Sequence, residues 1–209
     1  MRIQSVDHEE FPRAELDLSR LPRSPSPEVA AALVRLITRA EAVGLAPVGG
    51  EIDQHRLATV SKALNAAGIG TRAVFVQADP RAAVELLSGE LAESPVPGST
   101  WPHLVDLLGL EELAAMLGLS VSSVRRYASG ERVTPDDVAG RLHTLAMVVA
   151  DLAGSYNPYG IRRWFSRPRK ALDGQTPGEV LRASRSTVDD TGERRVRDLA
   201  ATLTAPFAS

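Results

Sequence analysis

Most of the chain carries apolar residues at the three- and four-residue spacing of amphipathic helices. In 28–43 the repeat is clearest, with one face made of Val29, Leu33, Leu36, Ile37 and Ala40. Pro27 suits the first turn of this helix and Gly44 its end. The same spacing predicts helices over 28–43, 53–67, 80–91, 101–108, 111–117, 121–129, 135–153, 158–166, 177–183 and 189–203.

One segment departs from the helical pattern. Residues 71–77 (TRAVFVQ) are short, rich in β-branched side chains and bounded by Gly70 and Asp79-Pro80. These features are typical of a β-strand. The fold class predicted from the sequence is therefore mainly α, with a small α/β N-terminal unit followed by an all-helical unit.

Composition places the boundaries between the predicted units. Residues 1–27 hold four prolines and no sustained periodicity, which is typical of a flexible arm. A small α/β unit of unknown role is expected over 28–97. The stretch 93–100 (ESPVPGST) has the composition of a linker. Helical units are expected over 98–154 and 155–209.

The segment 111–135 has the pattern of a helix-turn-helix, in which two short helices cross after a tight turn. Ala114 is small enough for close approach of the helices, and Gly118 stands where the turn needs positive φ. Leu119 is expected to plug the core between the helices, and Ser120 to cap the second helix.

The second helix of this segment carries candidate DNA contacts. Val121 and Val124 are expected to face inward, which leaves hydroxyl and arginine side chains outward. Serines and a helix N-terminus suit phosphates, and arginine can read guanine edges in the major groove. The expected DNA-binding residues are Ser120, Ser122, Ser123, Arg125, Arg126, Tyr127 and Arg132.

Composition and charge narrow the function classes. The net charge of −2 is unusual for a nucleic-acid binder, so any DNA-binding surface must be local. The chain has no cysteine, and its four histidines lack ligand-like spacing, which argues against a metal site. No phosphate loop or nucleophile elbow occurs. We expect a cytoplasmic protein that is not an enzyme and needs no cofactor.

A basic cluster follows in the C-terminal unit. It has five positive charges within nine residues, namely Arg162, Arg163, Arg167, Arg169 and Lys170. These charges surround Trp164 and Phe165, for which a role in a small core is the favoured interpretation. The cluster is compatible with DNA phosphates, an acidic partner surface or plain solvation.

Residues 105–204 resemble the Xre/MbcA/ParS antitoxin family, whose members join an Xre-like helix-turn-helix to a C-terminal toxin-binding domain. The first half of the resemblance is ELAAMLGLSVSSVRRYASGERVTP. The second half is a Trp-plus-apolar pair followed in order by Pro, Leu, Gly and Pro. In this chain these are Trp164 with Phe165, Pro168, Leu172, Gly174 and Pro177.

The resemblance implies an antitoxin that neutralises a RES-domain toxin acting on NAD and represses its own operon. It assigns 98–154 to the Xre-like domain and 155–209 to toxin binding, with the tail 199–209 reaching toward the toxin. The implied partner-binding residues are Arg162, Arg163, Trp164, Arg167, Arg169, Lys170, Leu199, Pro206 and Phe207.

Two other interpretations stay open, because about 100 residues before the helix-turn-helix match no motif of that family. One is a stand-alone helix-turn-helix regulator without a toxin. The other is a protein-interaction module whose helix-turn-helix is degenerate. A homodimer is expected for the DNA-binding interpretations, because paired half-sites strengthen binding to an operator.

Overall fold

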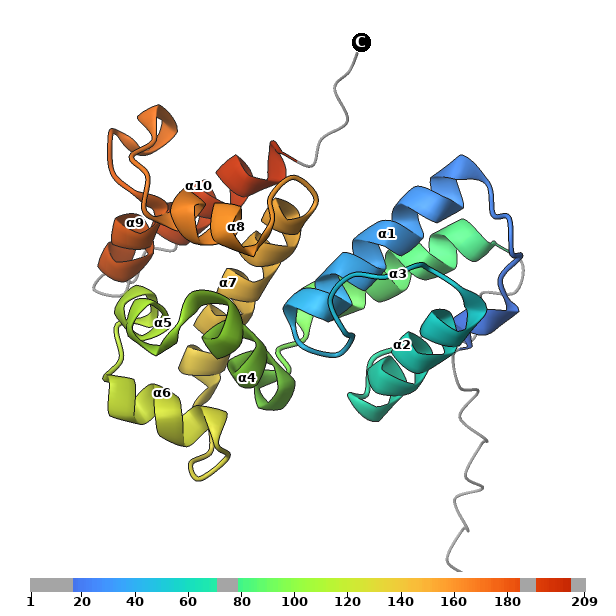
Figure 1. The fold of residues 1–209 in the computed structure, drawn as a ribbon, viewed down its shortest axis with the longest axis horizontal. Coiled ribbons are helices and arrows are strands. Elements are labelled where there is room, and N and C mark those ends of the chain that lie inside the picture. The colour runs from blue at the N-terminus through green and yellow to red at the C-terminus, as the bar shows by residue number, and fades with distance from the viewer. Residues whose placement is uncertain (1–16, 71–78, 185–190, 204–209) are drawn as a thin grey trace, which may run out of the picture.

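The structure is a computed structural model that describes residues 17–70, 79–184 and 191–203 (Figure 1). All regular elements in these ranges are helical. They are η1 (Leu18–Arg20), α1 (Pro27–Ala42), α2 (Gln54–Ala66), α3 (Pro80–Glu93), α4 (Pro97–Leu108), α5 (Leu110–Leu117), α6 (Val121–Ala128), α7 (Asp136–Ala153), α8 (Pro158–Phe165), η3 (Lys170–Leu172), α9 (Pro177–Ser184) and α10 (Thr191–Ala201).

The prediction of an α/β N-terminal unit is wrong, because the regular elements in the described part of that unit are the helices α1, α2 and α3. The segment 71–77 itself lies outside the described residues. The β-branched pattern of one short segment was therefore a poor guide to the class of the unit.

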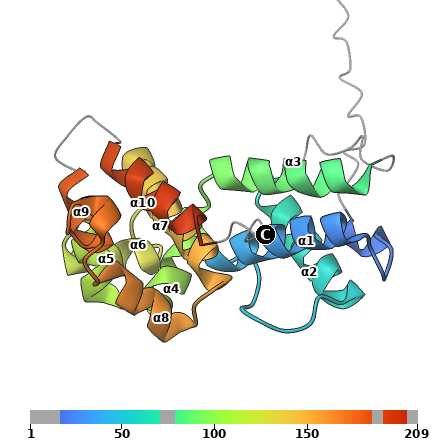
Figure 2. The same ribbon diagram turned by 90° about the horizontal axis from the view of Figure 1, so that it is seen from above.

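Helices α1 and α3 pack along each other and form the body of the N-terminal unit (Figures 1 and 2). Arg39 of α1 ties them together by donating to the backbone and side-chain oxygens of Ser88, both at 2.8 Å. Leu18, in the segment expected to be a flexible arm, is buried, and its N–H donates to Ser61 Oγ of α2 at 2.9 Å.

The connection between the two halves is shorter than the predicted linker over 93–100. Helix α4 already begins at Pro97, so only residues 94–96 join it to α3. A proline at the first helical position is favourable because its missing N–H would have no partner there. The Ser99 and Thr100 hydroxyls donate to the Val96 carbonyl at 3.2 Å and 2.8 Å, so these polar side chains have hydrogen-bond partners within the first turn of the helix.

Helix α7 is the central element of the molecule. It packs against α1 of the N-terminal unit and against α4 and α10 of the C-terminal half. Its buried residues belong to one hydrophobic core that also includes Leu36 of α1, Leu87 of α3 and Trp164 of α8. The described halves therefore share one core. Within the described ranges, no helix has the length and apolar character needed to cross a membrane.

Candidate nucleic-acid interface and partner surface

The turn between α5 and α6 has the geometry predicted from its sequence. Gly118 ends α5 in the left-handed region, with φ 61° and ψ 40°, as glycine readily does. Leu119 N–H donates to the Ala114 carbonyl at 2.8 Å, which closes the turn. Ser120 caps α6, since its Oγ accepts from the Ser123 N–H at 3.1 Å. The predicted roles of Gly118 and Ser120 are thus confirmed.

Helix α6 has one buried face and one solvent face. Val124 is fully buried against α4 and α5, and Val121 is half-buried. Ser122, Arg125 and Arg126 are exposed. Because residues three and four apart share a helix face, this exposed set forms one continuous surface over the helix.

The expectation that Tyr127 faces DNA is wrong, since its side chain is only 6% exposed. It follows Val124 by three residues, which places it on the same buried face. The ring stacks on Trp101 of α4, with centroids 5.5 Å apart and planes 18° from parallel. Sequence reasoning assigned it outward because a tyrosine among serines and arginines has the composition of a contact surface.

The Trp101–Tyr127 stack positions the loop after α6. Trp101 Nε1 donates to Thr134 Oγ1 at 2.9 Å, and the Arg132 guanidinium lies over the Tyr127 ring at 5.3 Å from its centroid. The Arg132 N–H also donates to the Arg126 carbonyl at 3.2 Å. Trp101 and Thr134 were missed at the sequence level, because their 33-residue separation hides their contact.

The C-terminal end of α5 is also held by a side chain of α7. Arg141 of α7 donates through Nη1 to the Leu117 carbonyl at 2.8 Å. Its Nη2 pairs with Asp137 at 3.1 Å. This arrangement satisfies a carbonyl that the end of α5 leaves without a helical partner. Helices α5 and α6 are thus fixed by contacts from both α4 and α7.

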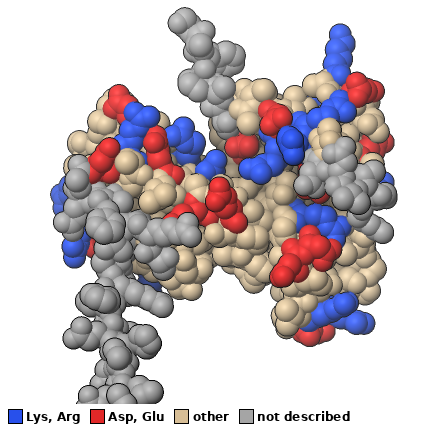
Figure 3. Space-filling view, turned by 180° about the vertical axis from the view of Figure 1, so that it is seen from behind, with Lys and Arg blue, Asp and Glu red and all other residues tan. Residues whose placement is uncertain are grey.

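The exposed side of α6 is locally cationic, although the net charge of the whole chain is −2. In the described ranges, the guanidiniums of Arg125, Arg126 and Arg132 form no ion pair with an acid. Val133, in the loop beyond α6, is 89% exposed. From behind, the molecule shows interspersed positive and negative side chains (Figure 3).

The predicted partner-binding cluster divides into exposed and structural residues. Arg163, Arg167 and Lys170 are exposed. Arg162 is exposed too, but it donates to the Leu107 carbonyl at 2.8 Å. Arg169 is half-buried, and its guanidinium lies 5.2 Å from the centroid of the Trp164 ring.

The expectation that Trp164 contacts a partner is wrong, whereas the core interpretation of Trp164 and Phe165 is confirmed. Trp164 is 2% exposed and meets Phe165 edge-to-face, with centroids 5.2 Å apart. Leu172 and Pro177 of the family-like pattern are buried as well. Trp164, Phe165 and Leu172 therefore belong to the shared hydrophobic core, because large apolar side chains at the ends of short helices must find a common interior.

The predicted tail residues have different outcomes. Leu199, on α10, is half-buried and packs against the core. Pro206 and Phe207 lie outside the described residues, so the structure gives no position for them. Helix α10 is tied to the segment after α8 by Arg195, which pairs with Asp173 at 2.7 Å.

A groove of about 500 Å³ lies between α5 and α8. Its lining includes the buried Met116 and Phe165, the exposed Arg163 and Glu112, and Tyr159, which is 64% exposed. Helices α6 and α8 lie well apart in this half of the molecule (Figure 1). No residue of α6 is among those that line this groove.

No group of potential metal ligands occurs in the described part of the chain. No protein family, curated protein or solved structure matches this chain. The antitoxin resemblance consequently rests on the helix-turn-helix segment and on the pattern from Trp164 to Pro177 alone.

Proposed function

We propose that this protein binds DNA in a sequence-specific manner, with α5 and α6 as a helix-turn-helix and α6 as its recognition helix. The observation that carries the proposal is the exposed face of α6. It presents Ser122, Arg125 and Arg126 beside a capped helix start, and no acidic side chain of the described chain neutralises the two arginines. Burial of Val124 and Tyr127 on the other face fixes the direction in which this surface points.

The side chains of α6 suit different parts of a duplex. Ser122 and the N-terminus of α6 suit phosphate oxygens, which fix register without reading sequence. Arg125 and Arg126 can each donate two hydrogen bonds to the major-groove edge of guanine. Val133 can contact a thymine methyl group. Such a protein would act in the cytoplasm as a homodimer, with two half-sites about 34 Å apart.

A DNA-binding titration against the DNA upstream of its own reading frame tests the proposal. We expect Arg125→Ala with Arg126→Ala to weaken binding at least about tenfold at about 0.1 M salt, because each bidentate pair contributes about 1–3 kcal/mol. The matched control is Arg163→Ala with Arg167→Ala, which removes the same charge far from α6. Equal losses of DNA affinity in both double variants would mean that the change in net charge alone explains the weaker binding. That result would contradict a recognition role for α6.

A second function, binding of a RES-domain toxin by the C-terminal helices, is favoured by the groove between α5 and α8. Its apolar floor and its exposed Tyr159 and Arg163 suit a protein segment with apolar and acidic side chains. The separation of this groove from α6 allows one molecule to hold DNA and a partner together. The antitoxin interpretation combines both activities.

The toxin interpretation has its own test. A RES-domain protein should be encoded in the neighbouring reading frame and should co-purify with this chain in a fixed ratio. Tyr159→Ala with Arg163→Glu should abolish the complex while DNA affinity stays within about twofold. A neighbouring RES-domain protein that remains separate from this chain would leave the stand-alone regulator as the better interpretation.

A further inference from the structure

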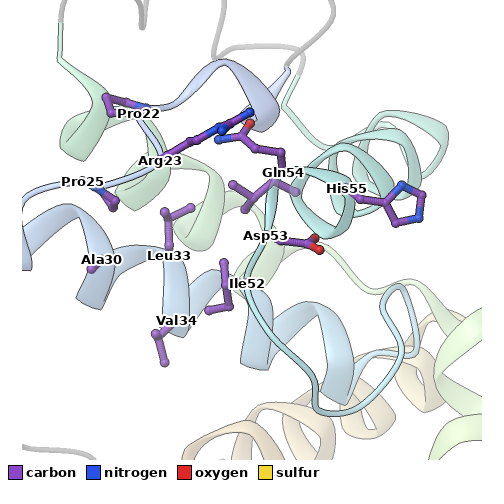
Figure 4. Close-up of a pocket in the computed structure, with 11 residues that line it drawn as sticks. Pro22, Arg23, Pro25, Ala30, Leu33, Val34, Ile52, Asp53, Gln54 and His55 are labelled. Atoms are coloured by element: carbon purple, nitrogen blue, oxygen red, sulfur yellow. The ribbon is translucent and has the colours of Figure 1, made fainter.

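The N-terminal unit has an open groove of about 610 Å³ that the proposed DNA-binding role does not use. It lies between the strap of residues 21–26, helix α1 and the start of α2 (Figure 4). Leu33 and Leu57 form a buried apolar floor. Its volume falls in the range of about 300–1,000 Å³ that is typical of small-molecule sites.

The walls of the groove are apolar and rigidly placed. Val34 and Ile52 are 51% and 42% exposed, although both belong to apolar residue types. Pro22 and Pro25 restrict the backbone of the strap. The strap is also anchored by Gln54 Nε2, which donates to the Leu21 carbonyl at 3.1 Å. A preformed apolar concavity of this kind binds apolar groups at low entropic cost.

The side chain of Arg56 holds the loop that carries Ile52 in position. Its guanidinium pairs with Glu41 and donates to the backbone oxygens of Gly49 and Pro47. Glu41 in turn accepts from the Gly49 N–H at 3.0 Å. The ion pair of Arg56 and Glu41 is largely buried, so the loop that carries Ile52 keeps its position without a ligand.

Two polar side chains of the groove, Arg23 and His55, have no hydrogen-bond or ion-pair partner among the described residues. Gln54 is engaged with Leu21, and Asp53 accepts from the Arg56 N–H at 2.7 Å as the cap of α2. Figure 4 shows Arg23 extending over the groove beside Gln54, while the His55 ring and the Asp53 carboxylate point away from Arg23. The positive charge that the groove offers to a ligand is therefore the Arg23 guanidinium, at one end of an apolar surface.

We propose that this groove binds a small molecule with an aliphatic body and one carboxylate, of the chemical class of medium-chain fatty acids. The aliphatic part would cover Leu33, Val34 and Ile52. The carboxylate would pair with Arg23, whose planar guanidinium matches a carboxylate in shape and charge. The groove is independent of the surfaces proposed for DNA and toxin binding.

Calorimetric titration of the full chain with decanoate, and with decanol as the neutral probe, tests the proposal. We expect saturable binding of one decanoate per chain below its micellar concentration. Arg23→Gln should weaken decanoate binding about fivefold, as the loss of a partly exposed ion pair does, and leave decanol binding unchanged. Arg20→Gln is the matched control, because it removes the same charge three residues away, outside the groove, and should have no effect.

Ala30→Phe fills the groove from α1 and should abolish binding of both probes while the helical circular dichroism is retained. Absence of saturable decanoate binding to the unaltered chain would overturn the proposal. So would decanoate binding that neither Arg23→Gln nor Ala30→Phe changes. A dimer that dissociates in Ala30→Phe, without decanoate binding, would identify the groove as a self-association surface and also overturn it.

Discussion

Arg125 and Tyr127 are two residues apart on α6, yet one faces solvent and the other completes the core beneath it. Tyr127 lies between the Trp101 ring and the Arg132 guanidinium. The ring therefore supports α6 and does not read DNA. The aromatic residue of this segment has a structural role, and the exposed Arg125 and Arg126 keep the proposed contact role.

The Trp101–Thr134 hydrogen bond gives a prediction about stability. Thr134→Val removes the acceptor of a fully buried indole N–H and should lower the free energy of unfolding by about 1–3 kcal/mol. Thr134→Ser keeps the hydroxyl and should stay within about 1 kcal/mol of the unaltered chain. Urea unfolding followed by tryptophan fluorescence measures both. Equal stability of the Val and Ser variants would show that the bond contributes little.

The single residues that the sequence predicted correctly are those whose role is local. Gly118 and Ser120 act on backbone groups within a few positions, so turn and capping rules apply to them directly. Tyr127 is placed by Trp101 on another helix, and its outward assignment was wrong. The favoured core role of Trp164 is confirmed, whereas its inclusion among the partner-binding residues was wrong. No pattern in the sequence points to Arg23 of the groove, because its proposed role depends on which neighbouring side chains already have hydrogen-bond partners.

Helix α1 ends where α4 begins to cross it, and Gly44 makes this approach possible. Gly44 has φ 73°, and a Cβ atom there would collide with the Ser99 carbonyl of α4. Ser99 Oγ donates to the Val43 carbonyl at 2.7 Å, so the two backbones are joined at this point. The helix-ending role predicted for Gly44 is confirmed, and the structure adds a packing role.

Gly44→Ala should therefore destabilise the protein by more than about 1 kcal/mol, from unfavourable φ and from displacement of α4. Gly98→Ala is the matched control. It lies in the first turn of α4, with open space where the added methyl group would stand, and it should be neutral or stabilising by about 0.4–1 kcal/mol. Thermal unfolding of both variants checks the difference. A Gly44→Ala variant as stable as Gly98→Ala would contradict the close packing of α1 on α4.

The helices were predictable as elements because each has its own apolar face and end signals. The errors arose where one segment was interpreted alone. The β-branched run over 71–77 suggested an α/β unit although the described part of that unit is helical, and the prolines of 93–100 suggested a linker although Pro97 begins a helix. How α7 packs on α1, α4 and α10 could not be predicted, because spacing along the chain does not specify partners.

The two halves of the molecule meet around His143 of α7. Its Nε2–H donates to the Ala92 carbonyl at the end of α3 at 2.8 Å, and its Nδ1 is buried with no hydrogen-bond partner among the described residues. Burial lowers the pKa of His143 below its ordinary value of 6.5, and the positive charges of Arg197 and Arg39 lower the pKa further. The bond to Ala92 opposes this shift.

Stability should consequently fall as the pH decreases below about 6.5. In that range the unfolded chain binds a proton at residue 143, while the folded chain resists it until its lower pKa is reached. One such group gives a slope of up to about 1.4 kcal/mol per pH unit. Burial also lowers the pKa of His103, which adds a slope of the same sign.

Urea unfolding between about pH 7.5 and 5.5 measures this effect. His143→Gln, which cannot titrate, should have a shallower slope than the unaltered chain, whatever its absolute stability. A slope that His143→Gln does not reduce would mean that this buried imidazole is not responsible for the acid sensitivity.

Guanine N7 methylation interference on the DNA upstream of the reading frame tests the proposed role of α6 most directly, because N7 lies in the major groove. We predict that methylation blocks binding at guanines in two half-sites about one helical turn apart, and that Arg125→Ala with Arg126→Ala removes this interference. Binding that is insensitive to N7 methylation throughout the fragment would contradict major-groove recognition by α6.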